Sequence, residues 1–101
     1  MNYKRYYIRA GDKTTANGVV LASSDFSRVD GRALALDGDP VDCPACDTQG
    51  IIRTAGPRLS DSFMGKQYAL SDDLCICGCS PPPRLVADQD AECQLVPALH
   101  P

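Results

Sequence analysis

The feature that most constrains this chain is a pair of cysteine clusters. Cys43-Pro44-Ala45-Cys46 is followed, after 28 intervening residues, by Cys75-Ile76-Cys77-Gly78-Cys79. Two cysteines separated by two residues can direct both sulfurs to one tetrahedral ion, and a second cluster farther along the chain can complete four ligands. Without a secretory signal, such spacing is more typical of a metal site than of a disulfide framework. We therefore predict a structural zinc ion that ties the middle of the chain to its later part.

A short segment that ends in aspartate recurs three times along the chain. Each copy is an alternating, extended run that ends in a turn, because Gly accepts positive φ and an Asp carboxylate can accept hydrogen bonds from backbone amides two residues on. The copies are Ile8-Arg9-Ala10-Gly11-Asp12, Leu34-Ala35-Leu36-Asp37-Gly38-Asp39 and, more loosely, Tyr68-Ala69-Leu70-Ser71-Asp72-Asp73.

The residues around these copies predict short strands. Val29-Asp30-Gly31-Arg32 and Phe63-Met64-Gly65-Lys66 carry Gly where a hairpin would reverse the chain, and Leu85-Val86-Ala87 can add a last strand. Gly18-Val19-Val20-Leu21 and Gly50-Ile51-Ile52-Arg53 predict strands that return after the first two copies. The predicted fold is therefore all-β, with three repeats at about residues 5–24, 25–56 and 57–88 that wrap around a pseudo-threefold axis and send their loops to one end.

The repeat register narrows the set of metal ligands. Cys43 lies four residues after the turn Asp39, and Cys77 lies four residues after Asp73. The corresponding residue of the first repeat is Ala16, which cannot bind metal, so the last repeat must provide two ligands. Cys43, Cys46 and Cys77 are thus three candidates, and the fourth is either Cys75 or Cys79, with Cys79 favoured.

Composition and charge argue against several classes of function. The chain has 101 residues, which predicts one domain, and its few aromatic residues predict a small core of Val, Ile, Leu and Ala. A formal charge of −3 gives no general attraction to nucleic acid. No apolar run is long enough to span a bilayer, and the segment from Met1 to Arg9 lacks the apolar part of a secretory signal. We therefore expect synthesis and folding in a reducing cytoplasm.

The combination resembles the PAAR-repeat family, whose members sit at the tip of the type VI secretion spike. The resemblance covers about residues 5 to 90 and is carried by the three turn motifs, by Gly18-Val19-Val20, by the run from Asp39 to Cys46 and by Cys77-Gly78. It implies a cone with a metal near its apex and carries ligand roles to Cys43, Cys46 and Cys77. Family members usually place a His where Ala16 stands and often one where Cys46 stands, so an all-thiolate site is expected here.

The resemblance also implies partners and location. It predicts a non-enzymatic structural protein whose flat base docks on the blunt end of the trimeric VgrG spike, with a non-covalent effector or adaptor as a further partner. One tip per trimer is expected, because the pseudo-threefold unit occupies all three positions. The protein would reside in the bacterial cytoplasm before secretion by the type VI system and would meet a membrane only during penetration.

The remaining residues carry competing or neutral interpretations. Residues 91–101 are expected to form a C-terminal tail beyond a PAAR-like domain of residues 1–90, with Cys93 a free thiol and His100 an exposed tail residue. The aspartates of the repeats are interpreted as turn formers, not as a calcium or catalytic site. An alternative to the spike tip is a zinc-ribbon-like module that binds nucleic acid or protein, and a further one is a thiol oxidoreductase that uses Cys43 and Cys46.

Overall fold

The computed structural model describes residues 2–22, 28–29, 31–56, 58–59, 62–63, 65–89 and 92–97. Every regular element within these ranges is a β-strand, which confirms the predicted all-β class. The strands are β1 (Asn2–Tyr6), β2 (Lys13–Thr14), β3 (Val19–Val20), β4 (Arg28–Val29), β5 (Arg32–Ala33), β6 (Pro40–Cys43), β7 (Thr48–Arg53), β8 (Ser62–Phe63), β9 (Lys66–Gln67), β10 (Leu74–Ile76), β11 (Leu85–Val86) and β12 (Cys93–Pro97). No membrane-spanning helix occurs in these ranges.

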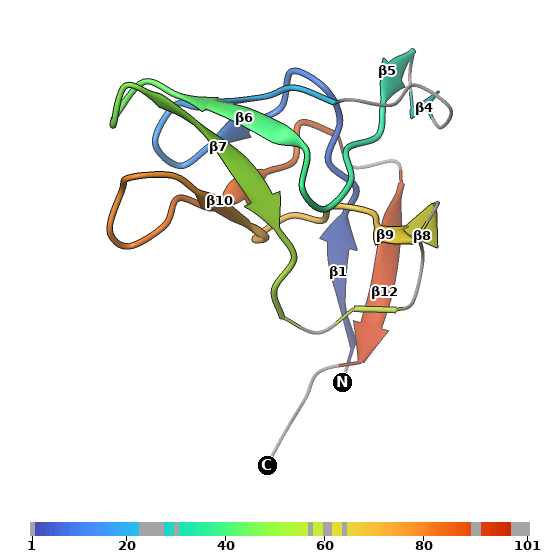
Figure 1. The fold of residues 1–101 in the computed structure, drawn as a ribbon. Helices are drawn as coiled ribbons and strands as arrows, with labels where there is room; N and C mark the ends of the chain where they lie inside the picture. Colours follow the sequence, from blue (N-terminus) through green and yellow to red (C-terminus); the bar gives the residue numbers. More distant parts are fainter. Residues whose placement is uncertain are drawn as a thin grey trace.

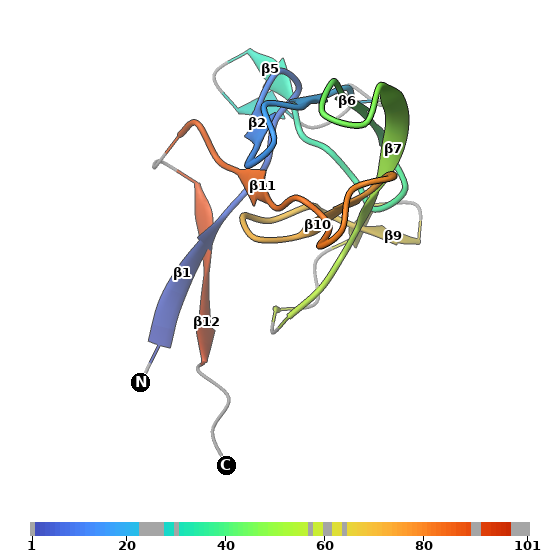
Figure 2. The same cartoon turned by 90° about the vertical axis from the view of Figure 1, so that its left-hand side faces the viewer.

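Six of the strands form a nearly closed ring of three strand pairs. Each turn motif leads into one pair, β2 with β3, β6 with β7 and β10 with β11, and the sheet runs in the order β10-β7-β6-β3-β2-β11 (Figures 1 and 2). The two ends of this sheet meet, since Leu74 bridges Arg84 and the Cys75 N–H donates to the Pro83 carbonyl at 2.8 Å. Closure removes the free sheet edges, which would otherwise invite pairing with other chains.

The turn motifs themselves form a second, inner cycle. The N–H of Ile8 donates to the Ala69 carbonyl (3.1 Å), Ala69 donates to Ala35 (2.9 Å), and Ala35 donates to Ile8 (2.9 Å). These three residues occupy the same place in their copies, and all are fully buried. The cycle is direct evidence that the three similar segments fold around a common pseudo-threefold axis.

Each motif ends in the same buried turn. Asp12, Asp39 and Asp73 are at most 1% exposed, and each carboxylate accepts a hydrogen bond of 2.8–2.9 Å from the backbone N–H three residues earlier. The sequence predicts that each Asp carboxylate accepts a hydrogen bond from a backbone amide two residues later, but the observed donors lie three residues earlier. The donors lie upstream because the turn folds the Asp side chain back over its own start, where a buried amide needs a partner. Gly11 and Gly38 have φ of 90° and 88°, and Asp72 takes the corresponding position with φ of 71°.

Three strand pairs lie at the opposite side from the loops that follow the turn motifs. Two are the predicted hairpins β4–β5 and β8–β9, in which Gly31 and Gly65 both have φ of 81°. The residues that precede these glycines, Asp30 and Met64, lie outside the described part. The third pair is β1 with β12, which joins the two ends of the chain in antiparallel register (Figure 1).

β12 corrects the expectation of a surface tail. Residues 93–97 form a strand in which Gln94 and Val96 are buried while Leu95 is 54% exposed. Gln94 faces inward because its amide makes two hydrogen bonds with the backbone of Leu59, at 2.8 and 3.2 Å. A buried Gln next to an exposed Leu hides the two-residue alternation by which a strand is recognised in sequence. Residue 91 and residues 98–101, including His100, lie outside the described part.

The core is small and aliphatic, in agreement with the prediction from composition. It lies inside the ring and takes inward-facing residues from all three repeats. Its members are Ile8, Val20, Ala35, Val41, Ile52, Ala69, Cys75 and Leu85. Because the core is so narrow, the loops beyond the ring must be held by means other than apolar burial.

Candidate metal centre

Four cysteines meet where the loops of the second and third repeats approach each other. Cys43 ends β6, and Cys46 lies in the turn that leads to β7. Cys77 and Cys79 follow β10 in the next loop. The four sulfurs all lie within 4.8 Å of one another, with the Cys43 Sγ 3.4 Å from that of Cys77 and 3.7 Å from that of Cys79. Four sulfurs about 2.3 Å from a zinc ion would be separated by about 3.8 Å, so the arrangement fits a tetrahedral thiolate site.

Cys75, the predicted alternative to Cys79, has a different place. It is fully buried in the apolar core and pairs in register with Ile52. Burial, together with the neighbouring Cys77, raises the pKa of Cys75 to about 12. An inert, buried thiol of this kind behaves as a small apolar side chain. The structure therefore gathers Cys79, and not Cys75, with the other three cysteines.

Gly50 permits the close approach of the two loops, and Gly78 contributes a hydrogen bond between them. A Cβ on Gly50 would lie 2.5 Å from the Ile76 carbonyl oxygen and 2.9 Å from the Cβ of Cys77, so only Gly lets β10 lie this close to β7. The Gly78 N–H donates to the Cys46 Sγ at 3.3 Å. Such N–H···S contacts stabilise negative charge on a ligating sulfur. The sequence marks Gly50 only as the start of a strand, because its contact with Cys77 joins residues far apart in the chain.

The protonation of the cluster depends on an ion. When the cluster consists of thiols without an ion, the pKa of Cys79 is raised to about 12. The hydrogen bond with Cys43 is the largest cause of this rise, and burial is the second. A bound dication reverses this situation, because it holds its ligating thiols deprotonated. Metal binding must therefore release protons, and affinity must fall as the solution becomes more acidic.

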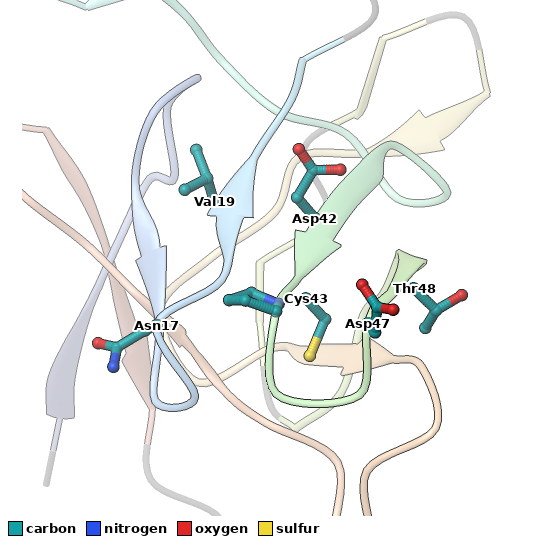
Figure 3. A pocket seen from close by; sticks show the side chains of 7 residues that line it. Asn17, Val19, Asp42, Cys43, Asp47 and Thr48 are labelled. Carbon is teal, nitrogen blue, oxygen red and sulfur yellow. The ribbon is translucent and has the colours of Figure 1, made fainter.

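The loop of the first repeat contributes no ligand. Across a groove of about 360 Å³, Asn17 and Val19 face Asp47 and Thr48, with Cys43 between them (Figure 3). Ala16, which corresponds to Cys43 and Cys77 in the repeat register, has no side-chain atom that can bind a metal. The neighbouring Thr15 joins the third repeat by hydrogen bonds with the Arg84 backbone, at 2.9 Å from its N–H and 3.0 Å to its hydroxyl oxygen. A metal would thus link the second and third repeats, while backbone contacts secure the first.

The other candidate residues lie outside this cluster. Cys93 belongs to β12 and pairs in register with Tyr6. The repeat aspartates are occupied within the fold: Asp73 accepts from Arg5 at 2.8 Å and also pairs with Arg58, and Asp12 pairs with Arg32 at 3.3 Å. Burial raises the pKa of Asp12 above its ordinary value, although the Arg9 amide and the charge of Arg32 oppose this shift. These carboxylates support the turns, as the sequence predicts, and do not converge on an open site.

Comparison with known proteins identifies the family. The family model described as the PAAR motif matches residues 10–80, which include the end of the first turn motif, the other two turn motifs in full and the four clustered cysteines. Neither the curated proteins nor the solved structures include a significant match. The matched family is structural rather than catalytic and is associated with the tip of the type VI secretion spike. The chain belongs to the PAAR-motif family.

Proposed function

We propose that this protein is a non-enzymatic tip that caps and sharpens the trimeric VgrG spike of a type VI secretion system, and so helps to deliver effectors across a target membrane. The observation that carries the proposal is the inner hydrogen-bond cycle of Ile8, Ala35 and Ala69, because a pseudo-threefold protein can match the end of a threefold partner. One chain supplies all three positions, so the stoichiometry is one tip per trimer. Before secretion the protein resides in the bacterial cytoplasm.

The two sides of the ring have different roles in this proposal. The strand pairs β4–β5, β8–β9 and β1–β12, to which we refer as the base, lie on the right in Figure 1 and dock on the spike. The loops on the left form the apex, where zinc bound by Cys43, Cys46, Cys77 and Cys79 replaces the missing apolar burial. Structural zinc can contribute on the order of 10 kcal/mol to a small fold, which far exceeds the ~1 kcal/mol of a typical hydrogen bond.

Native mass spectrometry with a purified VgrG trimer tests the docking. We expect one chain and one zinc ion per trimer. Lys66→Glu, on the exposed surface of β9 in the base, should weaken the complex, whereas Lys13→Glu, on the exposed surface of β2 in the ring, should not. Equal effects of the two charge reversals, or a different stoichiometry, would contradict the proposed docking.

Titration with DNA at low salt distinguishes the zinc-ribbon alternative. A module of that class should bind DNA with an affinity that falls steeply with salt, because phosphate contacts release counterions. We expect no such binding from this acidic chain. Salt-sensitive DNA binding without any association with the trimer would replace the spike-tip proposal.

A further inference from the structure

One flank of the ring carries an ordered grid of exposed and half-buried side chains that neither the core nor the metal cluster uses. The grid spans β6, β7 and β10, which are neighbours in the sheet (Figure 1), and Arg84, which bridges Leu74 just before β11. Strand registers arrange it in three rows across the strands. The row nearest the apex is Asp42 and Gln49, the middle row is Pro40, Ile51 and Ile76, and the row nearest the base is Arg53, Leu74 and Arg84.

The middle row is apolar and accessible. Ile51 is 41% exposed and Ile76 is 38% exposed, and they are direct cross-strand partners. Pro40 pairs with Ile51 from the other side, and Leu74 extends the apolar surface toward the base. Three strands set about 4.8 Å apart make this row about 10 Å long, close to two turns of an α-helix.

The rows on either side give the flank opposite charges. Arg53 and Arg84 are exposed, and neither guanidinium forms an ion pair in the part of the chain that the structure describes. On the apical side, Asp42 is exposed and accepts a 3.4 Å hydrogen bond from Gln49. Charged groups beside an apolar centre favour a partner with complementary charges in the same order.

We propose that this flank, defined by the three rows above, docks an amphipathic α-helix of a protein carried with the spike. The helix would place aliphatic residues at positions i, i+4 and i+7 over Ile51 and Ile76, and carboxylates over Arg53 and Arg84. The idea rests on the proposed function, since it gives the non-covalent cargo a binding site away from the base.

The charges argue against two other occupants. In a symmetric contact with a second copy, the two flanks together would carry four arginines and only two Asp42 carboxylates, so the positive charges could not all be neutralised. An anionic membrane would be attracted by Arg53 and Arg84, but its uniform negative charge would also face the exposed Asp42. A single helix can place its acidic residues over Arg53 and Arg84 and away from Asp42.

The probe is a synthetic, helix-stabilised peptide of about four turns, with leucines on one face and glutamates along one side. The control peptide has the same sequence with lysines in place of the glutamates. We expect the acidic peptide to bind and to shift the NMR signals of Ile51, Leu74 and Ile76. The double variant Ile51→Ser/Arg53→Glu should weaken binding by about tenfold or more, which corresponds to about 1.4 kcal/mol.

A matched control lies on another flank. Val86 on β11 is 45% exposed and pairs with Lys13 on β2, so Val86→Ser/Lys13→Glu likewise replaces one exposed β-branched side chain by Ser and reverses one positive charge, on another part of the ring. It should leave peptide binding unchanged. Equal binding of the lysine peptide, shifts confined to other strands, or equal effects of the two double variants would overturn the inference.

Two further measurements assign the surface. Binding of mixed phosphatidylcholine–phosphatidylglycerol vesicles that the Ile51→Ser/Arg53→Glu variant abolishes would reassign the flank to a membrane, and loss of a dimer in the same variant would reassign it to a second copy. Both results overturn the cargo helix. Binding to the VgrG trimer should be the same for wild type and both double variants, so failure at the flank and failure of the proposed docking at the base are separate outcomes.

Discussion

The replacement Val96→Ala tests whether the last described strand is part of the folded unit. Val96 is 1% exposed, and its neighbour Leu95, on the opposite face of β12, is 54% exposed. Val→Ala removes two carbon atoms from a packed site, worth about 0.8 kcal/mol each in transfer free energy, and leaves a cavity in addition. We expect a loss of about 1.5 to 3 kcal/mol in the free energy of unfolding.

Leu95→Ala is the matched control, because it shortens a larger apolar side chain in the same strand. Its expected cost is within about 0.5 kcal/mol, as for other exposed positions. Urea unfolding of both variants at one fixed excess of zinc gives the comparison, since bound ligand adds its own stabilisation to the folded state. The slope of free energy against urea should not change.

Two results would refute the reasoning. If both variants unfold like the wild type, β12 does not pack on the ring, and residues 93–97 behave as the tail that the sequence predicts. If Leu95→Ala is costly and Val96→Ala is not, the strand is present but its opposite face is buried, which shifts the register with β1 by one residue.

Three further predictions test the turns, the cluster and the buried charge. Gly38→Ala should lower the free energy of unfolding by about 1 kcal/mol, because a Cβ there meets nothing within 4 Å and only the φ of 88° opposes it. Asp72→Gly, at the same position of the third turn, should raise the free energy of unfolding, and urea unfolding measures both changes. Cys79→Ser should remove zinc, as measured by elemental mass spectrometry, whereas Cys75→Ser should keep zinc and lower the thermal midpoint. The loss of unfolding free energy caused by Asp12→Asn should become smaller as pH rises from about 4 to 7. Burial raises the pKa of the Asp12 carboxyl, so its contribution to stability is largest when it is protonated and is lost as pH rises through the native pKa. If urea unfolding shows a loss that grows over this range, the predicted sign is wrong.

The sequence predicts the repeat architecture well because its signals are local. Glycines with positive φ mark the hairpins and two of the turns, and β-branched runs mark β3 and β7. The cysteine spacing likewise identifies the candidate metal cluster, since the loops of equivalent repeats must lie at the same end of the ring.

What the sequence could not provide depends on contacts between distant segments. The choice between Cys75 and Cys79 follows from which face of β10 points into the core, and a run of alternating cysteines gives no apolar pattern to decide it. The pairing of β1 with β12 joins the two ends of the chain, and its inward Gln94 is recognisable only through its hydrogen bonds with Leu59. In both cases a residue's role is set by its partners and not by its own type.

The threefold architecture and the metal cluster stabilise different parts of the molecule. The hydrogen bonds that close the cycle of Ile8, Ala35 and Ala69 are backbone contacts within the buried core, and none of them involves a clustered cysteine. The four cysteines come from two loops, so an ion there would cross-link the loops of the second and third repeats. Loss of the ion would therefore loosen these loops before it opens the ring, and the base that faces the proposed partner would keep its shape.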